Sequence, residues 1–363
     1  MRYSSLILIC LLMVSIESYS QSFKNHPVPP KAGHPSFQKE GSWHSDPILA
    51  DCVSSSPEKG RWPQAGGVFP AKSLYRDCRS RQCPDFFRDE GVKPIRVLTW
   101  NIYMRPHSIT FDGQFRRAKA IGEVLKTEDY DIILFQEAFG KTSRKKLRKA
   151  LAGEFPFEIE PENRKKLVNS GLWILSKHEI INSEFIFFDG CLVSDCKAAK
   201  GAVLFEVEIN GQTYQFVNTH VQAEDGKEFA LVRAEQFKMI DQLLQKNQKP
   251  QIPQFILGDL NTAFSMKEEY DSMLTTLNST DGKVSVLEAS ELSVAEPITW
   301  GCKNNDLIKK KWKGQTYLLD YALERKTDYP FKLRRELKTY TQQWSKKRNH
   351  LSDHYAISLT ILP

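Results

Sequence analysis

Residues 255–261 read Phe-Ile-Leu-Gly-Asp-Leu-Asn, and this stretch decides how the sequence is interpreted. It starts as a short run of aromatic and aliphatic residues, which is typical of a buried strand. It ends in Asp259 and Asn261, polar residues that a core strand would not choose. In α/β sheets, sites assemble at strand ends and in the loops beyond them. The stretch therefore predicts a strand that carries two polar side chains to a site, although a helix cap also explains Asp259 taken alone.

Similar apolar runs recur from residue 95 onward, and helical patterns lie between them. Apolar residues from Phe229 to Leu244 fall on one stripe, and those from Tyr270 to Leu277 repeat at helical spacing. Asn210-Gly211 separates two of the runs and is a strong hairpin signal. The pattern predicts an α/β fold with a mixed sheet. The predicted strands are residues 95–101, 131–135, 171–175, 185–188, 202–209, 214–220 and 255–259.

Composition agrees with a globular domain. The 363 residues include 51 Lys+Arg and 44 Asp+Glu, a net charge of +7, and 40% are hydrophobic. These values exclude a disordered chain, a collagen and a coiled coil. Basic clusters occur at residues 141–149, 309–313 and 346–348. Such clusters attract anionic lipid surfaces or nucleic acid, but the spacing of the first also fits a solvated helix face.

The N-terminal quarter differs from the rest of the sequence. Arg2, an apolar run from Leu6 to Val14 and small residues at Ser18 and Ser20 are typical of a secretory signal peptide. A buried N-terminal helix is the alternative. We therefore expect residues 1–20 to be a signal peptide and the mature protein to be secreted. Residues 21–93 are rich in Pro, Gly and Ser and predict an irregular arm, and residues 94–363 form the main domain.

The cysteines fit an oxidising compartment. One of the seven, Cys10, lies in the predicted signal peptide, and six remain. An even count in an exported chain favours disulfides, so we expect Cys52, Cys78 and Cys83 to staple the arm. Local pairing of Cys191 with Cys196 is plausible. Six cysteines allow about 15 connectivities, and the pairing stays open on these grounds.

The polar strand ends form a chemically coherent set. Their oxygens suit Mg²⁺ or Mn²⁺ better than Zn²⁺, and two histidines beside a hard cation indicate acid/base work. Such a site is suited to phosphoryl transfer to water, with one imidazole deprotonating the attacking water. The oxygen donors are Asn101, Glu137, Asp259, Asn261 and Asp353, and the histidines are His220 and His354.

On these residues the sequence resembles the endonuclease/exonuclease/phosphatase superfamily of DNase I-like metal phosphoesterases. Within it, the sequence is most similar to the secreted neutral sphingomyelinases. The most discriminating feature is the string Thr219-His220-Val221-Gln222-Ala223-Glu224-Asp225. The resemblance implies a four-layer α/β sandwich, in which two mixed sheets pack together between helices. The ordered blocks that carry it are residues 100–101, 136–137, 219–220, 258–261, 319–321 and 352–354.

The resemblance also implies a role for each matched residue. Glu137 is the principal Mg²⁺ ligand, with Mn²⁺ or Co²⁺ as possible substitutes. Asn101 lies beside it and Asp353 is in the metal shell. Asp259 and Asn261 hold the phosphate and the attacking water near the metal. These assignments imply a hydrolase that acts on sphingomyelin in membrane surfaces to give ceramide and phosphocholine.

The acid/base roles follow from the same resemblance. His354 is the general base, oriented by Asp320. His220 contacts the phosphate or assists the departing ceramide oxygen. Asp225 has a weaker, supporting role. Lys200 could reach the phosphate as a point charge, although a lysine beside a glycine is equally often a turn residue.

The sequence departs from the family pattern in two places. The usual second cysteine after Asp225 is absent, so Cys191 pairs locally or with Cys302. Trp344 occupies a place comparable to the aromatics that enter the bilayer in relatives, but Ser345 stands where a second aromatic is expected. Peripheral membrane contact is expected from the resemblance, whereas this departure favours the alternative of a packed Trp344. We expect a monomer, and the alternatives to a sphingomyelinase are a secreted DNase I-like nuclease and an inactive scaffold.

Overall fold

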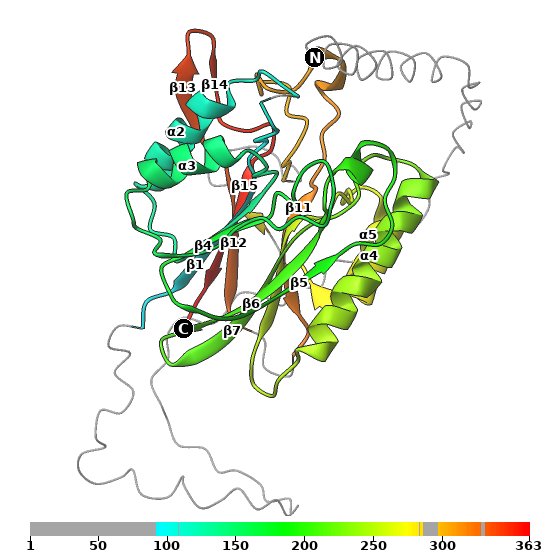
Figure 1. The fold of residues 1–363 in the computed structure, drawn as a ribbon. Coiled ribbons are helices and arrows are strands. Elements are labelled where there is room, and N and C mark those ends of the chain that lie inside the picture. Colours follow the sequence, from blue (N-terminus) through cyan, green and yellow to red (C-terminus); the bar gives the residue numbers. More distant parts are fainter. Residues whose placement is uncertain (1–91, 108, 283, 286–296, 328–330) are drawn as a thin grey trace, which may run out of the picture. The chain divides into compact units, whose positions relative to one another are not determined.

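Two β-sheets form the centre of the structure, a computed structural model that describes residues 92–107, 109–282, 284–285, 297–327 and 331–363 (Figure 1). The first sheet has seven strands and is mixed, because β1 pairs in parallel with β2 but antiparallel with β15. Its strand order is β10 (Val284–Ser285), β12 (Leu333–Lys338), β15 (Ala356–Ile361), β1 (Ile95–Asn101), β2 (Ile132–Gln136), β4 (Trp173–Ser176) and β3 (Phe157–Ile159).

The second sheet has six strands and is also mixed, since β7 and β8 are parallel while β8 and β11 are antiparallel. The predicted Asn210-Gly211 hairpin is confirmed between β6 and β7, and both turn residues have positive φ, 54° and 76°. Its strand order is β5 (Ile180–Phe187), β6 (Gly201–Ile209), β7 (Gln212–His220), β8 (Gln254–Asp259), β11 (Asp320–Arg325) and β9 (Ser279–Thr280). A separate hairpin joins β13 (Thr341–Ser345) to β14 (Arg348–His350).

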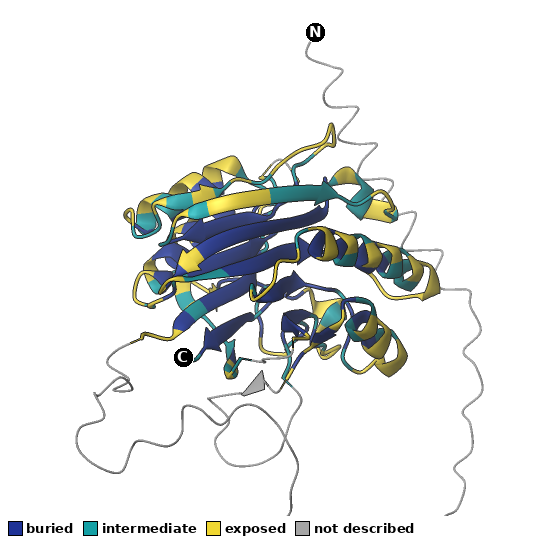
Figure 2. Cartoon of the chain, turned by 90° about the horizontal axis from the view of Figure 1, so that it is seen from below, coloured by how far each residue is buried: buried dark blue, intermediate teal, exposed yellow. Residues whose placement is uncertain are grey.

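Helices cover the outer face of each sheet. The helices α2 (Gln114–Leu125) and α3 (Lys141–Ala150) pack on the first sheet, and α4 (Lys227–Lys246) and α5 (Lys267–Thr276) pack on the second. Between the sheets lies a third apolar cluster that includes Phe205, Phe216 and Phe255. Figure 2 shows these central strands buried and the helices exposed on their outer sides. The predicted four-layer α/β sandwich is therefore confirmed.

The predicted strands and helical stripes agree with the structure to within a few residues, except that 185–188 is the end of a longer strand, β5. On α4 the stripe buries Phe237, Ile240 and Leu243. The basic cluster at 141–149 lies on α3, as the helix-face interpretation expects. Residues 310–312 form η3 and residues 193–197 form a second 3₁₀ turn, η2.

The disulfide between Cys191 and Cys196 is present, with an S–S distance of 2.05 Å, so the local pairing is the correct alternative. Cys302 has a free thiol. The predicted signal peptide (1–20) and nearly all of the arm (21–93), with its three cysteines, lie outside the described residues. Within the described ranges, no helix combines the length and the apolar character needed to cross a membrane.

Candidate active site

Strand register brings three predicted residues side by side. His220 at the end of β7 pairs with Asp259 at the end of β8, and Asp320 at the start of β11 pairs with Asp259 from the other side. In the first sheet, Asn101 ends β1 beside Gln136, and Glu137 follows directly. Polar residues that are far apart in the sequence thus meet at the same end of the two packed sheets, as expected for residues at strand ends.

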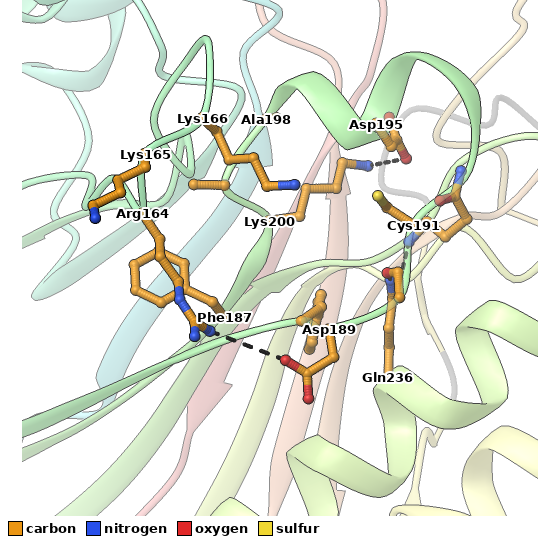
Figure 3. Close-up of a pocket in the computed structure, with 14 residues that line it drawn as sticks. Arg164, Lys165, Lys166, Phe187, Asp189, Cys191, Asp195, Ala198, Lys200 and Gln236 are labelled. Carbon is orange, nitrogen blue, oxygen red and sulfur yellow. Dashed lines mark hydrogen bonds and ion pairs between the residues drawn. The ribbon is translucent and has the colours of Figure 1, made fainter.

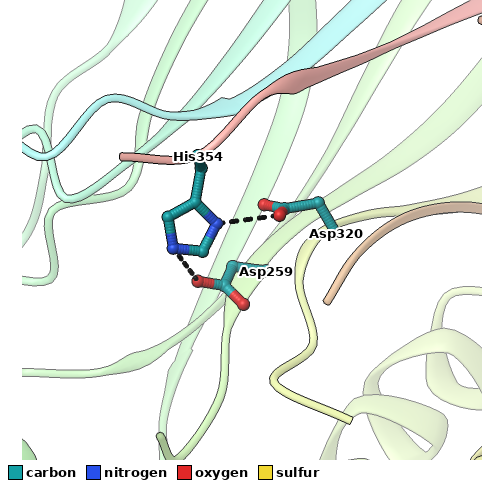
Figure 4. Close-up of side chains that lie close together, drawn as sticks. All are labelled: Asp259, Asp320 and His354. Carbon is teal, nitrogen blue, oxygen red and sulfur yellow. Dashed lines mark hydrogen bonds and ion pairs between the residues drawn. The ribbon is translucent and has the colours of Figure 1, made fainter. Parts of the chain in front are cut away.

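His354 lies between two carboxylates (Figure 4). Its Nδ1 is 2.8 Å from Asp320 Oδ2, and its Nε2 is 3.8 Å from Asp259 Oδ2. The main chain is fixed as well, because the Trp100 indole donates to the His354 carbonyl at 3.0 Å and the His354 amide donates to Ser352 Oγ at 3.2 Å. The Nδ1–H tautomer that Asp320 favours leaves Nε2 free to accept a proton.

Asn101 connects the two sheets within the site. Its Nδ2 donates to Asp259 Oδ2 at 2.9 Å and to Glu137 Oε1 at 3.3 Å. Ser352 Oγ donates to the Asn101 carbonyl at 2.6 Å. Glu137 has a φ of 53°, a conformation that is uncommon outside glycine and that clusters at functional sites. The side chain of Glu137 is therefore held toward Asn101 by a backbone conformation that the fold imposes.

Three carboxyl groups of the site have raised pKa values. Burial and the charge of Asp353 raise the pKa of Glu137, and burial also raises the pKa of Asp353. Burial and the neighbouring Asp320 raise the pKa of Asp259 to about 7. Several ionised acids together in a desolvated site destabilise the fold unless a cation or protonation compensates their charge. This donor set fits a bound divalent cation.

The oxygen-rich composition indicates which cation fits. Asp259, Asp320 and His354 have ligand atoms within 4.8 Å of one another, and this is a candidate metal site. Within it, Asp320 is already hydrogen-bonded to His354 Nδ1. The remaining oxygens of Glu137, Asp353 and Asp259, with the side-chain amide of Asn101, suit a hard cation such as Mg²⁺.

The pKa values of the two histidines shift in opposite directions. Burial and the charge of Lys200 lower the pKa of His220 well below its usual value, so His220 is neutral. Burial would also lower the pKa of His354, but Asp320 and Asp259 outweigh it and raise that pKa well above its usual value. A cation bound at Asp259 would cancel part of this effect and leave Asp320 as the main partner of His354.

Lys200 lies next to the site but already has partners. Its Nζ donates to Asp195 Oδ2 at 2.6 Å (Figure 3). It also donates to the Val221 carbonyl at 2.7 Å. The side-chain Nδ2 of Asn261 donates to the same carbonyl at 3.2 Å, and the main-chain amide of Asn261 donates to Asp259 Oδ1 at 3.1 Å. Of the predicted site residues, Lys200 alone lines the neighbouring cavity of about 330 Å³, which Arg164, Lys165 and Lys166 also line.

The string Thr219–Asp225, on which the resemblance to sphingomyelinases chiefly depends, has a structural role after His220. The Leu192 amide donates to Gln222 Oε1 at 2.8 Å, and the Ala223 amide donates to Asp195 Oδ2 at 2.8 Å. Gln222 and Ala223 therefore attach the segment after His220 to the loop that the Cys191–Cys196 disulfide closes.

Two further predicted residues lie outside the buried cluster. Asp225 is exposed in the segment that joins β7 to α4. Trp344 in β13 is half-buried, and its indole donates to the His350 carbonyl at 2.7 Å. Its ring also lies directly against Gly113. Trp344 is thus packed, as the alternative interpretation expects, and its membrane contact stays a prediction.

Two arginines contribute to the site without having been predicted from the sequence. Arg117 on α2 is fully buried and donates to the carbonyls of Ile102 and Leu351, both at 2.9 Å. It thereby joins the segment after Asn101 to the one before Asp353. Arg105 stacks on the Tyr103 ring, and its charge opposes the rise that burial causes in the pKa of Glu137. A lone arginine among the apolar positions of a helix is the one signal that could have indicated Arg117.

Comparison with known proteins agrees with this geometry. Residues 98–270 match the model of the Endonuclease/Exonuclease/phosphatase family. Sphingomyelinase C 2 of Leptospira interrogans is 29% identical over 68% of this chain and 42% of its own length. For a second sphingomyelinase C of Leptospira interrogans the covered share of its length is 57%, so this chain spans about half of these two relatives.

Shorter relatives and solved structures are covered more fully. A phospholipase C of Staphylococcus aureus is 28% identical over 72% of this chain and 86% of its own length. The crystal structure of a beta toxin variant from Staphylococcus aureus with bound magnesium ions is 25% identical, with a TM-score of 0.66, and the match covers 74% of this chain and all of that one (100%). The predicted resemblance is confirmed: residues 98–270 match the model of the Endonuclease/Exonuclease/phosphatase family, and the chain is similar to sphingomyelinase C.

Proposed function

We propose that this domain is a Mg²⁺-dependent phosphodiesterase that hydrolyses sphingomyelin in membrane surfaces to ceramide and phosphocholine. The observation that carries the proposal is His354, bound through Nδ1 to Asp320 and placed beside a cluster of buried carboxyl groups. For water to attack a phosphodiester, a general base must lie next to a site that holds a hard cation, and the His354 imidazole has this position. The relatives named sphingomyelinase C support the choice of substrate.

The mechanism assigns a task to each residue. Glu137, Asn101, Asp353 and Asp259 would hold the cation, which when bound acts as a Lewis acid on the phosphate. His354 takes a proton from water through Nε2 while the water oxygen bonds to phosphorus. The bond from phosphorus to the ceramide oxygen breaks, the departing oxygen takes up a proton from a water molecule, and the His354 imidazolium then returns its proton to solvent.

Asp320 and His220 have different tasks. Asp320 fixes the tautomer of His354 and stabilises the imidazolium that forms. Buried and neutral, His220 donates a hydrogen bond to the phosphate or to the departing oxygen. Asn261, whose amide is bound to Asp259 Oδ1, helps to position the phosphate and the water.

We also propose that residues 1–20 direct export and are removed, so that the mature enzyme acts outside the cell as a monomer. N-terminal sequencing of the protein recovered from culture medium tests the cleavage. A mature N-terminus near residue 21 is expected. Intact Met1 in a retained, cell-associated protein would contradict the proposal.

Phosphocholine release from sphingomyelin vesicles tests the proposed reaction. We expect release to stop in EDTA and return when Mg²⁺ is added in excess. His354→Ala should lower the rate by at least 100-fold, because general-base catalysis typically contributes that much or more. The matched control is His178→Ala, because His178 is a half-buried surface residue paired with Asp131 at 3.2 Å.

Plasmid nicking run in parallel tests the alternative substrate. A DNase I-like nuclease is the second candidate, since the exposed lysines of α3 and of the β13–β14 hairpin would attract any polyanion. Mg²⁺-dependent nicking without phosphocholine release would show that the family assignment is right and the substrate wrong. Phosphocholine release without nicking would support the sphingomyelinase.

A further inference from the structure

The loop between β1 and α2 carries two exposed apolar side chains. Ile109 is 56% exposed and Phe111 is 81% exposed, the highest value among the large hydrophobic residues that the structure describes. A single exposed apolar residue needs no explanation, but neighbouring ones at the end of the molecule that holds the active site are a candidate interaction surface.

Both ends of this loop are tied to the site. The Arg117 guanidinium donates to the Tyr103 carbonyl at 2.6 Å and to Asp112 Oδ1 at 2.8 Å. The same side chain holds the Leu351 carbonyl, which precedes the segment of Asp353 and His354. Ile109 and Phe111 are therefore presented by a loop whose base is fixed relative to the catalytic residues.

Basic side chains flank the loop on the side of α3. The His107 ring meets the Phe111 ring edge-on, with 4.6 Å between centroids, and stacks on Phe115 at 4.7 Å. Lys146 Nζ lies 5.9 Å from the centre of the Phe115 ring. Lys145 and Lys146 are both exposed. One continuous row of side chains thus leads from Phe111 to the positive charges of α3.

The other flank is the β13–β14 hairpin, which lies beside α2 (Figure 1). The Trp344 ring lies against Gly113, at the base of the loop. The Arg348 guanidinium lies 5.9 Å from the centre of the Trp344 ring. Lys346, Lys347 and Arg348 are exposed at the turn of the hairpin. The loop is therefore placed between two groups of exposed cations.

We propose that Ile109 and Phe111 enter the interface of an anionic lipid membrane while the flanking lysines and Arg348 contact its headgroups. This inference rests on the proposed function and names the surface that would bring the active site to its lipid. An apolar tip with basic flanks is the pattern of an interfacial membrane contact. An aliphatic Ile109 gains from leaving water for acyl chains but has no ring on which a nucleic-acid base could stack.

The proposal is tested on vesicles of phosphatidylcholine with a minority of phosphatidylserine, in EDTA and without sphingomyelin, so that substrate and turnover play no part. Sedimentation of the full chain measures partitioning. Phe111→Ala should lower it by about tenfold, because the variant loses most of a buried aromatic side chain. Phe111→Leu should retain most of the binding. The matched control is Leu231→Ala on α4, where the replaced side chain is 63% exposed.

The double substitution Lys145→Glu, Lys146→Glu tests the flank. It should weaken partitioning onto the phosphatidylserine vesicles and have little effect on pure phosphatidylcholine. Thermal unfolding midpoints equal to that of the wild type show that each variant is folded. Partitioning of Phe111→Ala at the wild-type level, or an equal loss in Leu231→Ala, would overturn the proposal.

Three further outcomes distinguish failure of this inference from failure of the proposed function. If the lysine variant loses affinity for duplex DNA in a fluorescence anisotropy titration but binds vesicles normally, the flank serves nucleic acid and the membrane surface is wrong. If the wild type releases phosphocholine while Phe111→Ala partitions normally, only the surface is wrong. Vesicle binding that depends on Phe111 without any phosphocholine release by the wild type would overturn the function alone.

Discussion

The hydrogen bond between Asp320 and His354 allows a quantitative prediction. Asp320→Asn keeps the size of the side chain but removes its charge, 2.8 Å from His354 Nδ1. Asp320 is the largest of the charges that raise the pKa of His354 against its burial. Its loss should therefore lower that pKa, and His354 should become neutral at a lower pH.

The expected magnitude follows from the kind of bond. A buried hydrogen bond to a charged group contributes about 1.5–3 kcal/mol, which corresponds to roughly 10- to 150-fold in rate. The same energy corresponds to about one to two pH units in the titration of His354. We expect kcat/KM for phosphocholine release to fall by this factor, and the acidic limb of its pH profile to move to lower pH.

The assay is kcat/KM for phosphocholine release from sphingomyelin in mixed micelles across the pH range, at saturating Mg²⁺, with circular dichroism to confirm folding. A folded Asp320→Asn with the wild-type rate and profile would refute the assigned role. A lower rate with an unmoved acidic limb and a higher Mg²⁺ requirement would make Asp320 a metal ligand, which its place in the candidate metal site allows.

Three other substitutions test the site and its support. Glu137→Gln removes a carboxylate whose pKa is raised by burial and by the charge of Asp353. The metal-free variant should therefore be more stable than the wild type in thermal unfolding at pH 8. In Mg²⁺ titrations of activity, it should need roughly tenfold more Mg²⁺ or beyond, because a ligand is lost. Gly258→Ala places Cβ 2.0 Å from the Thr219 carbonyl oxygen at a φ of +150°, so urea unfolding should show a loss of about 3 kcal/mol or more; near-wild-type stability would contradict that steric argument. Lys200→Met leaves Asp195, whose side chain is 13% exposed, without its cation and should cost about 3 kcal/mol in urea unfolding. Lost activity with unchanged stability would instead support direct contact with the phosphate.

The sequence predicts those parts of the fold in which hydrophobic pattern and structure agree. The strands β1 and β8 are apolar runs with buried residues throughout most of their length, and their polar ends mark the site. By contrast, β12 reads Leu-Arg-Arg-Glu-Leu-Lys and β13 reads Thr-Gln-Gln-Trp-Ser. Neither has a hydrophobic period of two, and backbone pairing with β15 or β14 defines them as strands. The strands β12 and β13 were therefore not predicted. The prediction also missed β15, although Ile357, Leu359 and Ile361 alternate along it at a period of two.

The candidate site shows the same division. Residue type and position at strand ends predicted the oxygen donors and both histidines, and the resemblance added the role of Asp320 and the ordered blocks. The side-by-side placement of His220, Asp259 and Asp320 depends on register across β7, β8 and β11, which no local pattern specifies. The clamp by Arg117 depends on carbonyls from segments far apart in the chain. Such contacts are determined by tertiary packing and leave little signal in the sequence.

The position of β15 has a consequence for how the protein folds. This strand, residues 356–361, is inserted between β12 and β1, so that among the described residues the first strand completes its hydrogen bonds with the last. The contact between Trp100 and His354 spans 254 positions. Contacts of such separation slow folding and leave strand edges open until they form. During synthesis, one edge of β1 must therefore wait until residues 356–361 have been made, and a chain that ends before residue 354 cannot assemble the His354 site.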